Sequence, residues 1–259
     1  MAGIAECQEC QGTSWIEVST PRGPAAKRCY CFYEEQRKSR FQAMGLPRRF
    51  EDASFDSFSA GDYRTEKERF NTLTAAMRRA KSFVDGFPIT RKKGLLFHGG
   101  SPRDKTHLAV ATLKCLVDKG FSGMFCEYGQ LLLTLRARSD PNAAISGPSR
   151  ETARRVANVD VLLLDGLGDH RATAWTLDTA SAIIKHRYLN EKCLLATTGF
   201  SLETAPRPEP DRFREASYMP FPDTLGDRIG QEAVLRLVDH CESVSMVVNE
   251  AGAPGSPPH

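Results

Sequence analysis

The sequence of 259 residues lacks any run of apolar residues long enough to cross a membrane, so we expect no membrane association. Its first residues, MAGIAECQEC, lack the basic region and apolar run that are typical of a signal peptide. Eight cysteines without such a signal favour reduced thiols over disulfides. The sequence therefore predicts a cytoplasmic protein.

An excess of charge of one sign is also missing. The formal net charge is only +3, which is too small to indicate nucleic-acid binding by itself. The surplus of Lys and Arg lies within residues 1–93. A basic surface there would suit a phosphate backbone or an acidic partner, and a solvated surface explains the same residues equally well.

Cysteine is concentrated at the start of the chain, in the pattern C-x2-C, eighteen residues, C-x-C. The four residues are Cys7, Cys10, Cys29 and Cys31. Two close pairs can offer four thiolates to one tetrahedral Zn²⁺ in a closed structural site. The segment is too short to fold on a core of its own, so we expect zinc to supply its folding energy. Four unligated thiols are the alternative, because C-x-C is the less common spacing.

The composition predicts four parts along the chain. Residues 1–42 form a zinc-binding module, with a hairpin between the cysteine pairs and a charged helix at its end. Residues 43–62 form an extended linker whose phenylalanines dock on the next domain. Residues 63–250 form the main domain, in which the proline-rich segment 204–223 is a long loop or insertion. Residues 251–259 form a disordered tail.

Strands and helices alternate within the main domain. We expect strands at 95–98, 123–127, 159–165, 193–197 and 243–248. We expect helices at 64–85, 105–119, 130–138, 150–157, 175–189 and 225–240. Strands that are apolar on both faces and alternate with helices indicate an α/β sandwich of three layers around a central parallel sheet.

The first predicted strand is followed by GGSPRDKT, which matches the P-loop pattern G-x-x-x-x-G-K-[ST] except at the second glycine. Gly99 fits the first glycine, Lys105 would reach the β- and γ-phosphates of ATP, and Thr106 would bind Mg²⁺. Asp104 replaces the second glycine and would repel the phosphates, and Pro102 has no amide to donate. A chance Lys-Thr pair at the start of a helix is an equal alternative.

A second motif, VDVLLLDGLGDH, ends a buried strand in Asp165, which is placed to hold Mg²⁺ through water. A buried strand that merely ends in Asp is the alternative interpretation. Many P-loop ATPases carry a second acid directly after this position, where the present chain has Gly166. Asp169 is acidic and near, but we expect it not to reach the same point.

Taken in order, these motifs resemble those of the DnaC/DnaI-type replicative helicase loaders, AAA+ ATPases close to the transposition helper IstB. The resemblance covers nearly the whole chain through GTSW, GLPRRFEDASFDSF, KGLLFHGGSPRDKTHLAVA, VDVLLLDGLG, TTGFSLE and LGDRIGQEAVLRLVDHCESV. It implies a P-loop AAA+ three-layer sandwich, ATP with Mg²⁺ as cofactor, and Lys105, Thr106 and Asp165 as Walker residues. It also implies that Arg236 is the arginine finger that reaches the ATP of a neighbouring copy, and hence a homo-oligomer. Judged without the resemblance, Arg236 forms a surface salt bridge.

Several positions depart from the family pattern, and they concentrate at the nucleotide site. Besides the changes at Pro102, Asp104 and Gly166, Gly199 replaces the sensor asparagine and Leu235 replaces the serine before the finger arginine. Because the scaffold pattern is intact, these losses predict that hydrolysis is weak or lost. They leave ATP binding open.

Three functions follow from the sequence. The first is an AAA+ helicase loader in DNA replication that binds a replicative helicase through the zinc module and single-stranded DNA through the AAA+ domain. The second is a catalytically silent adaptor that uses the same surfaces without nucleotide. The third is an IstB-like transposition helper. Tight ATP binding separates the first from the second, and the identity of the protein partner separates the first from the third.

Overall fold

The structure, a computed structural model, describes residues 7–136, 147–203 and 224–247. The predictions for the proline-rich segment 204–223 and the tail 251–259 lie outside the described residues. No helix within the described ranges is long and apolar enough to cross a membrane.

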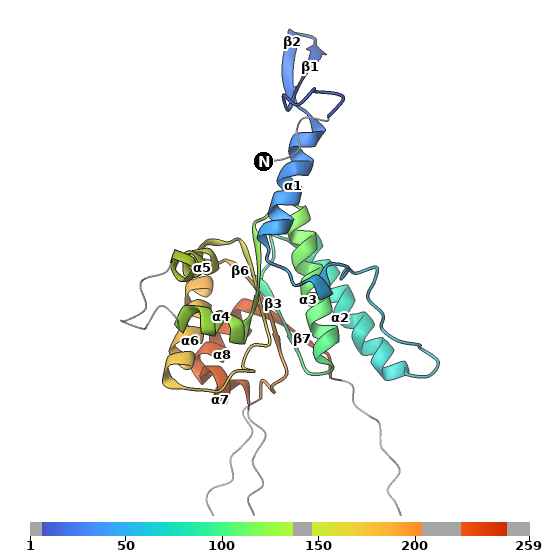
Figure 1. The fold of residues 1–259 in the computed structure, drawn as a ribbon. Coiled ribbons are helices and arrows are strands. Elements are labelled where there is room, and N and C mark those ends of the chain that lie inside the picture. The colour runs from blue at the N-terminus through green and yellow to red at the C-terminus, as the bar shows by residue number, and fades with distance from the viewer. Residues whose placement is uncertain (1–6, 137–146, 204–223, 248–259) are drawn as a thin grey trace, which may run out of the picture.

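The main domain contains a five-stranded sheet in the order β4-β5-β6-β3-β7 (Figure 1). Its strands are β3 (Gly94–His98), β4 (Gly123–Glu127), β5 (Val161–Asp165), β6 (Cys193–Thr198) and β7 (Cys241–Ser245). Every neighbouring pair is parallel. All residues of β5 and β6 are buried, as expected for strands covered on both faces. The predicted parallel sheet is confirmed.

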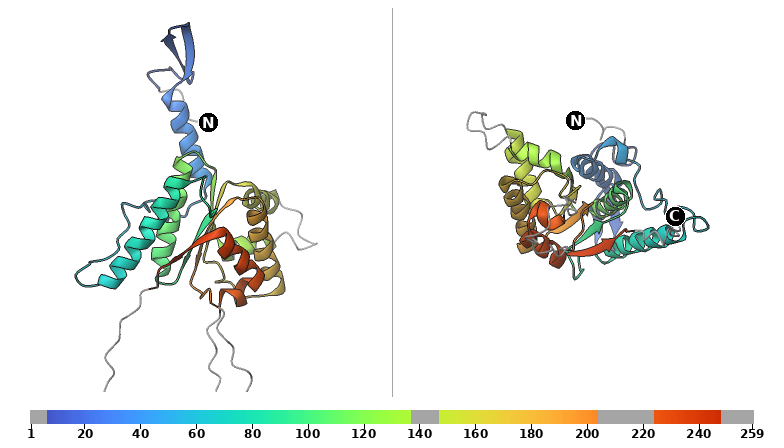
Figure 2. Two further views of the ribbon diagram at one scale, coloured as in Figure 1. Left: turned by 180° about the vertical axis from the view of Figure 1, so that it is seen from behind. Right: turned by 90° about the horizontal axis from the view of Figure 1, so that it is seen from below.

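Helices cover both faces of the sheet, which makes three layers (Figure 2). One face carries α2 (Lys67–Gly86) and α3 (Pro102–Asp118). The other carries α4 (Tyr128–Arg136), α5 (Gly147–Asn158), α6 (Ala174–Leu189), α7 (Leu225–Ile229) and α8 (Gln231–His240). Successive side chains of β3 point to opposite faces of the sheet. Leu95 and Phe97 pack in the core on the side of α2 and α3, and Leu96 packs in the core on the other side.

Two boundaries near the C-terminal end of the described chain differ from the prediction. The single helix expected at 225–240 is divided into α7 and α8 by Gly230, whose φ of 90° lies in the left-handed region that glycine tolerates. The last strand begins at Cys241 and not at residue 243, because Cys241 pairs with Gly94 at the start of β3.

The N-terminal segment stands away from the sandwich (Figure 1). An antiparallel hairpin of β1 (Trp15–Thr20) and β2 (Gly23–Arg28) connects the two cysteine pairs, as predicted. Helix α1 (Tyr30–Ala43) then runs down to the sheet, where Met44 accepts a hydrogen bond of 2.8 Å from the backbone of Phe125 in β4. This contact joins the end of α1 to the edge of the sheet.

The predicted linker follows α1 along the sandwich. It contains one short 3-10 helix, η1 (Arg48–Phe50), and is otherwise without helix or strand up to residue 66. Phe55 and Phe58 pack against the core between the sheet and α2 and α3. The prediction that the aromatic residues of the linker dock on the next domain is therefore confirmed.

Candidate functional site

A cavity of about 650 Å³ lies at the carboxyl ends of the parallel strands. The chain leaves β3 toward β4 on one side and leaves β6 toward β7 on the other, so the cavity lies where the connections diverge. Ligands of open α/β sheets bind at such a point. The cavity is lined by Arg49, Phe50, Pro102, Arg103, Lys105, Thr106, Glu127, Asp165, Gly166, Asp169, Thr197, Thr198 and Gly199.

Asp165 is the centre of a buried hydrogen-bond network in this cavity. Thr106 Oγ1 donates to Asp165 Oδ1 at 2.7 Å, and Thr197 Oγ1 donates to the same oxygen at 2.8 Å. The Thr197 hydroxyl also accepts a hydrogen bond of 2.9 Å from the backbone of Gly166. The structure thus brings the hydroxyl and the carboxylate predicted to share Mg²⁺ into direct contact. An oxygen pair of this kind suits a hard cation.

Lys105 lies beside this network and is buried, with 2% of its surface exposed. Its ammonium donates to the carbonyl oxygens of Gly99 at 2.8 Å and Gly100 at 3.1 Å. Burial lowers the pKa of Lys105, and the carboxylates of Asp169 and Asp165 oppose that shift. The site therefore holds a cation whose hydrogen bonds are made with the loop itself.

Gly99 and Gly100 are needed for the backbone of the loop. Both have positive φ, 73° and 58°, and a Cβ on either would overlap the segment that follows β7, at Val247 or at the carbonyl of Met246. Gly99 thus has a structural reason to be glycine, independent of any phosphate.

The structure corrects two expectations about the altered loop. Helix α3 begins at Pro102, three residues earlier than predicted, and proline is favoured at this first position because its missing N–H has no partner within the helix. The carboxylate of Asp104 does not line the cavity. It turns toward α2, where it accepts a hydrogen bond of 2.8 Å from Arg69 Nη2. The predicted repulsion between Asp104 and bound phosphates is therefore partly neutralised.

The expectation that Asp169 does not reach the position after Asp165 is wrong. A Cβ placed on Gly166 would lie 2.6 Å from Asp169 Oδ2, so the carboxylate occupies the space of the absent side chain. Partial burial and the charge of Asp165 raise the pKa of Asp169, while Lys105 lowers it. Asp169 lines the cavity together with both of these residues.

Sequence reasoning missed several residues of the cavity. Thr197 and Thr198 end β6 beside Asp165, and the polar pair after the apolar run CLLA is the signal that would have found them. Arg49 and Phe50 of the linker also line the cavity. The Arg49 guanidinium lies 4.6 Å from the centroid of the Phe50 ring. Glu127 ends β4 and accepts hydrogen bonds from the first backbone amides of α4. Gly199 lines the cavity at the predicted sensor position.

Arg236 lies outside this cavity. It projects from α8 and forms an ion pair with Glu232 one turn earlier on the same helix. Leu235 and Val238 beside it are 71% and 40% exposed. The structure therefore does not bring Arg236 together with the site of its own chain.

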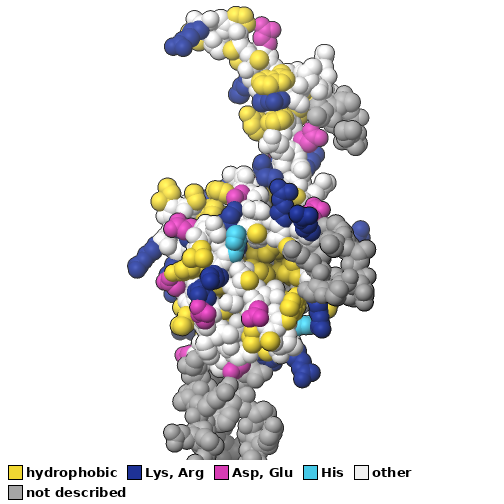
Figure 3. Space-filling view, turned by 90° about the vertical axis from the view of Figure 1, so that its left-hand side faces the viewer, with side chains coloured by type: hydrophobic (Ala, Val, Ile, Leu, Met, Phe, Trp, Pro, Cys, Tyr) yellow, Lys and Arg dark blue, Asp and Glu magenta, His cyan; other side chains and the backbone are white. Residues whose placement is uncertain are grey.

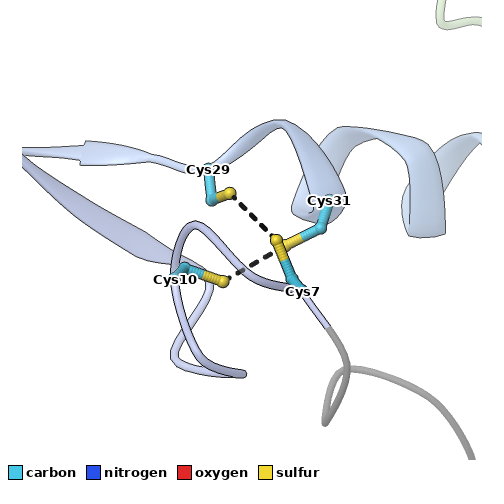
Figure 4. A group of neighbouring side chains, drawn as sticks. All are labelled: Cys7, Cys10, Cys29 and Cys31. Atoms are coloured by element: carbon cyan, nitrogen blue, oxygen red, sulfur yellow. Dashed lines mark hydrogen bonds between the residues drawn. The ribbon is translucent and has the colours of Figure 1, made fainter.

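The four N-terminal cysteines form a second candidate site (Figure 4). All four Sγ atoms lie within 4.8 Å of one another, and the closest pairs are Cys7–Cys29 at 3.6 Å and Cys10–Cys31 at 3.5 Å. A tetrahedral zinc ion with Zn–S bonds of about 2.3 Å requires sulfur atoms about 3.8 Å apart. The four thiols can therefore hold one metal ion of this kind, with no position left for a substrate.

The local fold explains how the cysteines converge. A tight turn after Cys7, closed by the backbone hydrogen bond from Gln11 to Cys7 and followed by Gly12 with φ of 85°, brings Cys10 back toward Cys7. Cys29 is the N-cap of α1 and Cys31 lies in its first turn. A backbone hydrogen bond from Cys10 lowers the pKa of Cys7 to about 6, whereas burial raises the pKa of Cys31 to about 12, so without a metal the four neighbouring thiols do not all ionise together.

Comparison with known proteins places this geometry in context. No protein-family profile matches the sequence. The chain is 26% identical over 187 residues to the "Uncharacterized protein YqaM" of Bacillus subtilis (strain 168), a match that covers 69% of this chain but 56% of that protein. The chain thus spans little more than half the length of this curated relative.

Solved structures with a fold similar to that of this chain include those of the DnaC helicase loader and of DnaI. The DnaC helicase loader superposes with a TM-score of 0.58 and 29% identity, over 77% of this chain and 99% of that chain. DnaI superposes with a TM-score of 0.56 and 20% identity, over 78% of this chain and 95% of that chain. The chain has the fold of a DnaC/DnaI-type helicase loader. The α/β class, the parallel sheet and the cysteine cluster predicted from the sequence agree with this fold.

Proposed function

We propose that this chain is an ATP-binding helicase loader of DNA replication. The observation that carries the proposal is the convergence of Lys105, Thr106 and Asp165 on one cavity, in a fold like that of a DnaC helicase loader at 29% identity. These three residues come from two separate motifs of the sequence. Packing alone does not explain why this cavity contains a buried carboxylate and a buried ammonium group, because burial of a charged group is costly.

In this proposal the phosphates of ATP bind at Lys105 and at the free backbone amides in the first turn of α3. Thr106 and Asp165 hold the Mg²⁺ ion, which neutralises phosphate charge when it is bound. Phe50 and Arg49 stand at the cavity and suit the base end of the nucleotide, since both can stack on a planar ring. Because Gly166 and Gly199 replace the acid and the asparagine of the family pattern, we propose that hydrolysis is slow.

The zinc-binding module is proposed as the surface that binds the replicative helicase. It stands away from the sandwich on α1, and Trp15, Tyr30 and Tyr33 are 45%, 59% and 56% exposed. Figure 3 shows hydrophobic side chains gathered on this module above the sandwich, with Lys and Arg side chains beside them. Exposed aromatic residues next to arginine are typical of protein interaction surfaces. Residues 1–42 and 63–250 would then act as separate domains joined by 43–62.

Single-stranded DNA is the proposed second partner, bound by the AAA+ domain of several copies. Arg236 would serve as the finger for the ATP of a neighbouring copy, because it projects from α8 beside the exposed Leu235 and Val238. Such a contact makes assembly depend on nucleotide. The chain would work in the cytoplasm, where replication takes place.

One observation favours the silent adaptor as a second candidate. The ammonium of Lys105 is already satisfied by Gly99 and Gly100, and α3 begins three residues before it, so the loop is stable without phosphate. An adaptor would bind the helicase equally well with or without ATP.

The test of the proposed function is a loading assay with the replicative helicase of the same organism and circular single-stranded DNA. We expect ATP to raise the amount of helicase on DNA at least about tenfold with the full chain, and Lys105→Ala to lose this effect. Lys185→Ala, on the exposed side of α6, is the matched control. Equal loading by Lys105→Ala would favour the adaptor, and a chain that binds no helicase would contradict the proposal.

A further inference from the structure

The turn after β5 folds back on itself, between Asp165 and Asp169. Its sequence is Asp165-Gly166-Leu167-Gly168-Asp169, closed by a hydrogen bond of 3.0 Å from the backbone of Asp169 to the carbonyl of Gly166. The buried Leu167 donates its amide to the carbonyl of Thr197 at 2.7 Å. This second bond fixes the turn against the end of β6.

Both glycines of this turn have backbone conformations that favour glycine. Gly166 and Gly168 have φ of 71° and 95°, a region that other residues rarely adopt. A Cβ on Gly168 would lie only 3.0 to 3.2 Å from Phe200, Leu225 and Arg228. The backbone of the turn is therefore held in one conformation, and the direction of Asp169 follows from it.

The carboxylate of Asp169 points to the place where a side chain on residue 166 would begin, with Oδ2 2.6 Å from that Cβ position. It faces the cavity that also contains Lys105, Thr106 and Asp165. No described residue donates a hydrogen bond to this carboxylate, and more than a third of Asp169 is exposed. An acid to which no described residue donates, at the edge of a cavity of about 650 Å³, is placed to accept a hydrogen bond from a water molecule there.

We infer that Asp169 is the catalytic base for the hydrolysis of ATP, in place of the acid that Gly166 lacks. The inference rests on the proposed function, because it requires ATP in this cavity. A water molecule attacks the γ-phosphorus of ATP, and the bond from that phosphorus to the bridging oxygen breaks. ADP leaves with the bonding electrons, and the Asp169 carboxylate takes one proton from the water. Inorganic phosphate is released and Asp169 returns its proton to solvent.

The charges around Asp169 support this role. Partial burial is the largest cause of the upward shift in the pKa of Asp169. Asp165 and Glu127 also raise this pKa, whereas Lys105 and Arg228 lower it. A base whose pKa lies above that of an ordinary aspartate accepts a proton more readily.

The experiment measures two quantities on the full chain with Mg²⁺, namely the affinity for a fluorescent ATP analogue and the release of phosphate from ATP. We expect Asp169→Asn to lower the rate of phosphate release at least about tenfold and to leave the affinity within about twofold. Asp178→Asn, an exposed acid on α6, is the matched control and keeps both values. The wild-type rate rises with pH through the pKa of Asp169, and Asp169→Asn removes that rise.

A double variant that moves the acid from residue 169 to residue 166 tests whether a lost rate reflects the missing carboxylate and not a distorted turn. Asp169→Gly removes the acid, and Gly166→Asp added to it returns an acid to the adjacent position without the overlap with Asp169. We expect this double variant to recover part of the rate lost in Asp169→Gly, since aspartate is among the residues that tolerate positive φ.

The outcomes separate this inference from the proposed function. Wild-type hydrolysis in Asp169→Asn would overturn it. A wild-type chain that binds the analogue but releases no phosphate would also overturn it, while the proposed ATP-binding function would stand. A chain that does not bind the analogue would overturn both.

Discussion

At the scale of single residues, we expect the ion pair between Arg69 and Asp104 to influence whether the altered loop accepts phosphate. Asp104 precedes Lys105 and is only 15% exposed at its side chain, so its charge is poorly screened by water. Arg69 on α2 holds the carboxylate at 2.8 Å, and this carboxylate together with Glu66 raises the pKa of Arg69. The pair directs a negative charge away from the cavity.

Removal of this arginine should weaken nucleotide binding. We expect Arg69→Ala to raise the Kd for an ATP analogue about three- to tenfold, because the charge of Asp104 is then unpaired near the phosphates. Adding Asp104→Asn should restore the affinity, which a double-mutant cycle with equilibrium binding measures. Arg78→Ala, an exposed residue on the same helix, is the control. An unchanged Kd in Arg69→Ala would show that Asp104 does not influence the site.

The N-terminal module and the sandwich depend, at the scale of elements, on different interactions. The sandwich has two large hydrophobic clusters, one on each face of the sheet. Strands β1 and β2 and helix α1 contain no buried residue, and the buried side chains beside the hairpin are Cys10, Ser14 and Cys29. We therefore predict that the module requires a bound metal for folding, whereas the sandwich does not.

Removal of the metal should unfold the module selectively. We expect about one equivalent of zinc in the purified chain, and a chelator should shift the fluorescence of Trp15 while the helical signal of the sandwich persists. Cys29→Ser should lose the metal, because three thiolates hold it far less tightly. Cys115→Ser, half-buried on α3, is the control and should keep it.

A metal-free chain whose four thiols react freely, with a hairpin unaffected by the chelator, would contradict this account of the module.

The regular parts of the elements could be predicted from periodicity, and the exceptions have identifiable causes. The apolar stripe of α2 predicts its buried face, since Leu73, Ala80 and Val84 lie in the core. The break at Gly230 interrupts no apolar repeat, so the pattern gave no sign of it. Arg187 on α6 is fully buried and donates to the carbonyls of Val156, Val159, Asp160 and Cys193. Its partners come from other elements, and local patterns do not contain them.

At the scale of the whole molecule, the order of the strands in the sheet brings the residues of the proposed nucleotide site together. Asp165 and Thr197 lie at the carboxyl ends of β5 and β6, and Lys105 follows β3. The order of β5, β6 and β3 in the sheet brings these ends together. The two motifs predicted Lys105, Thr106 and Asp165, because their residue types are specific. Thr197 was missed although it follows an apolar run, and the direction of Asp169 could not be predicted because it depends on the turn at Gly166 and Gly168. Arg236 stays a prediction that requires a second copy.

The measurement that tests the central claim most directly is the equilibrium binding of a fluorescent ATP analogue with Mg²⁺, compared between the full chain and Lys105→Ala. We predict binding at micromolar concentrations by the full chain and a loss of affinity of at least about tenfold in the variant, because Lys105 is the cation proposed to bind the phosphates. Lys185→Ala should bind as the wild type does. No binding by the full chain at millimolar nucleotide, or equal binding by Lys105→Ala, would contradict the account.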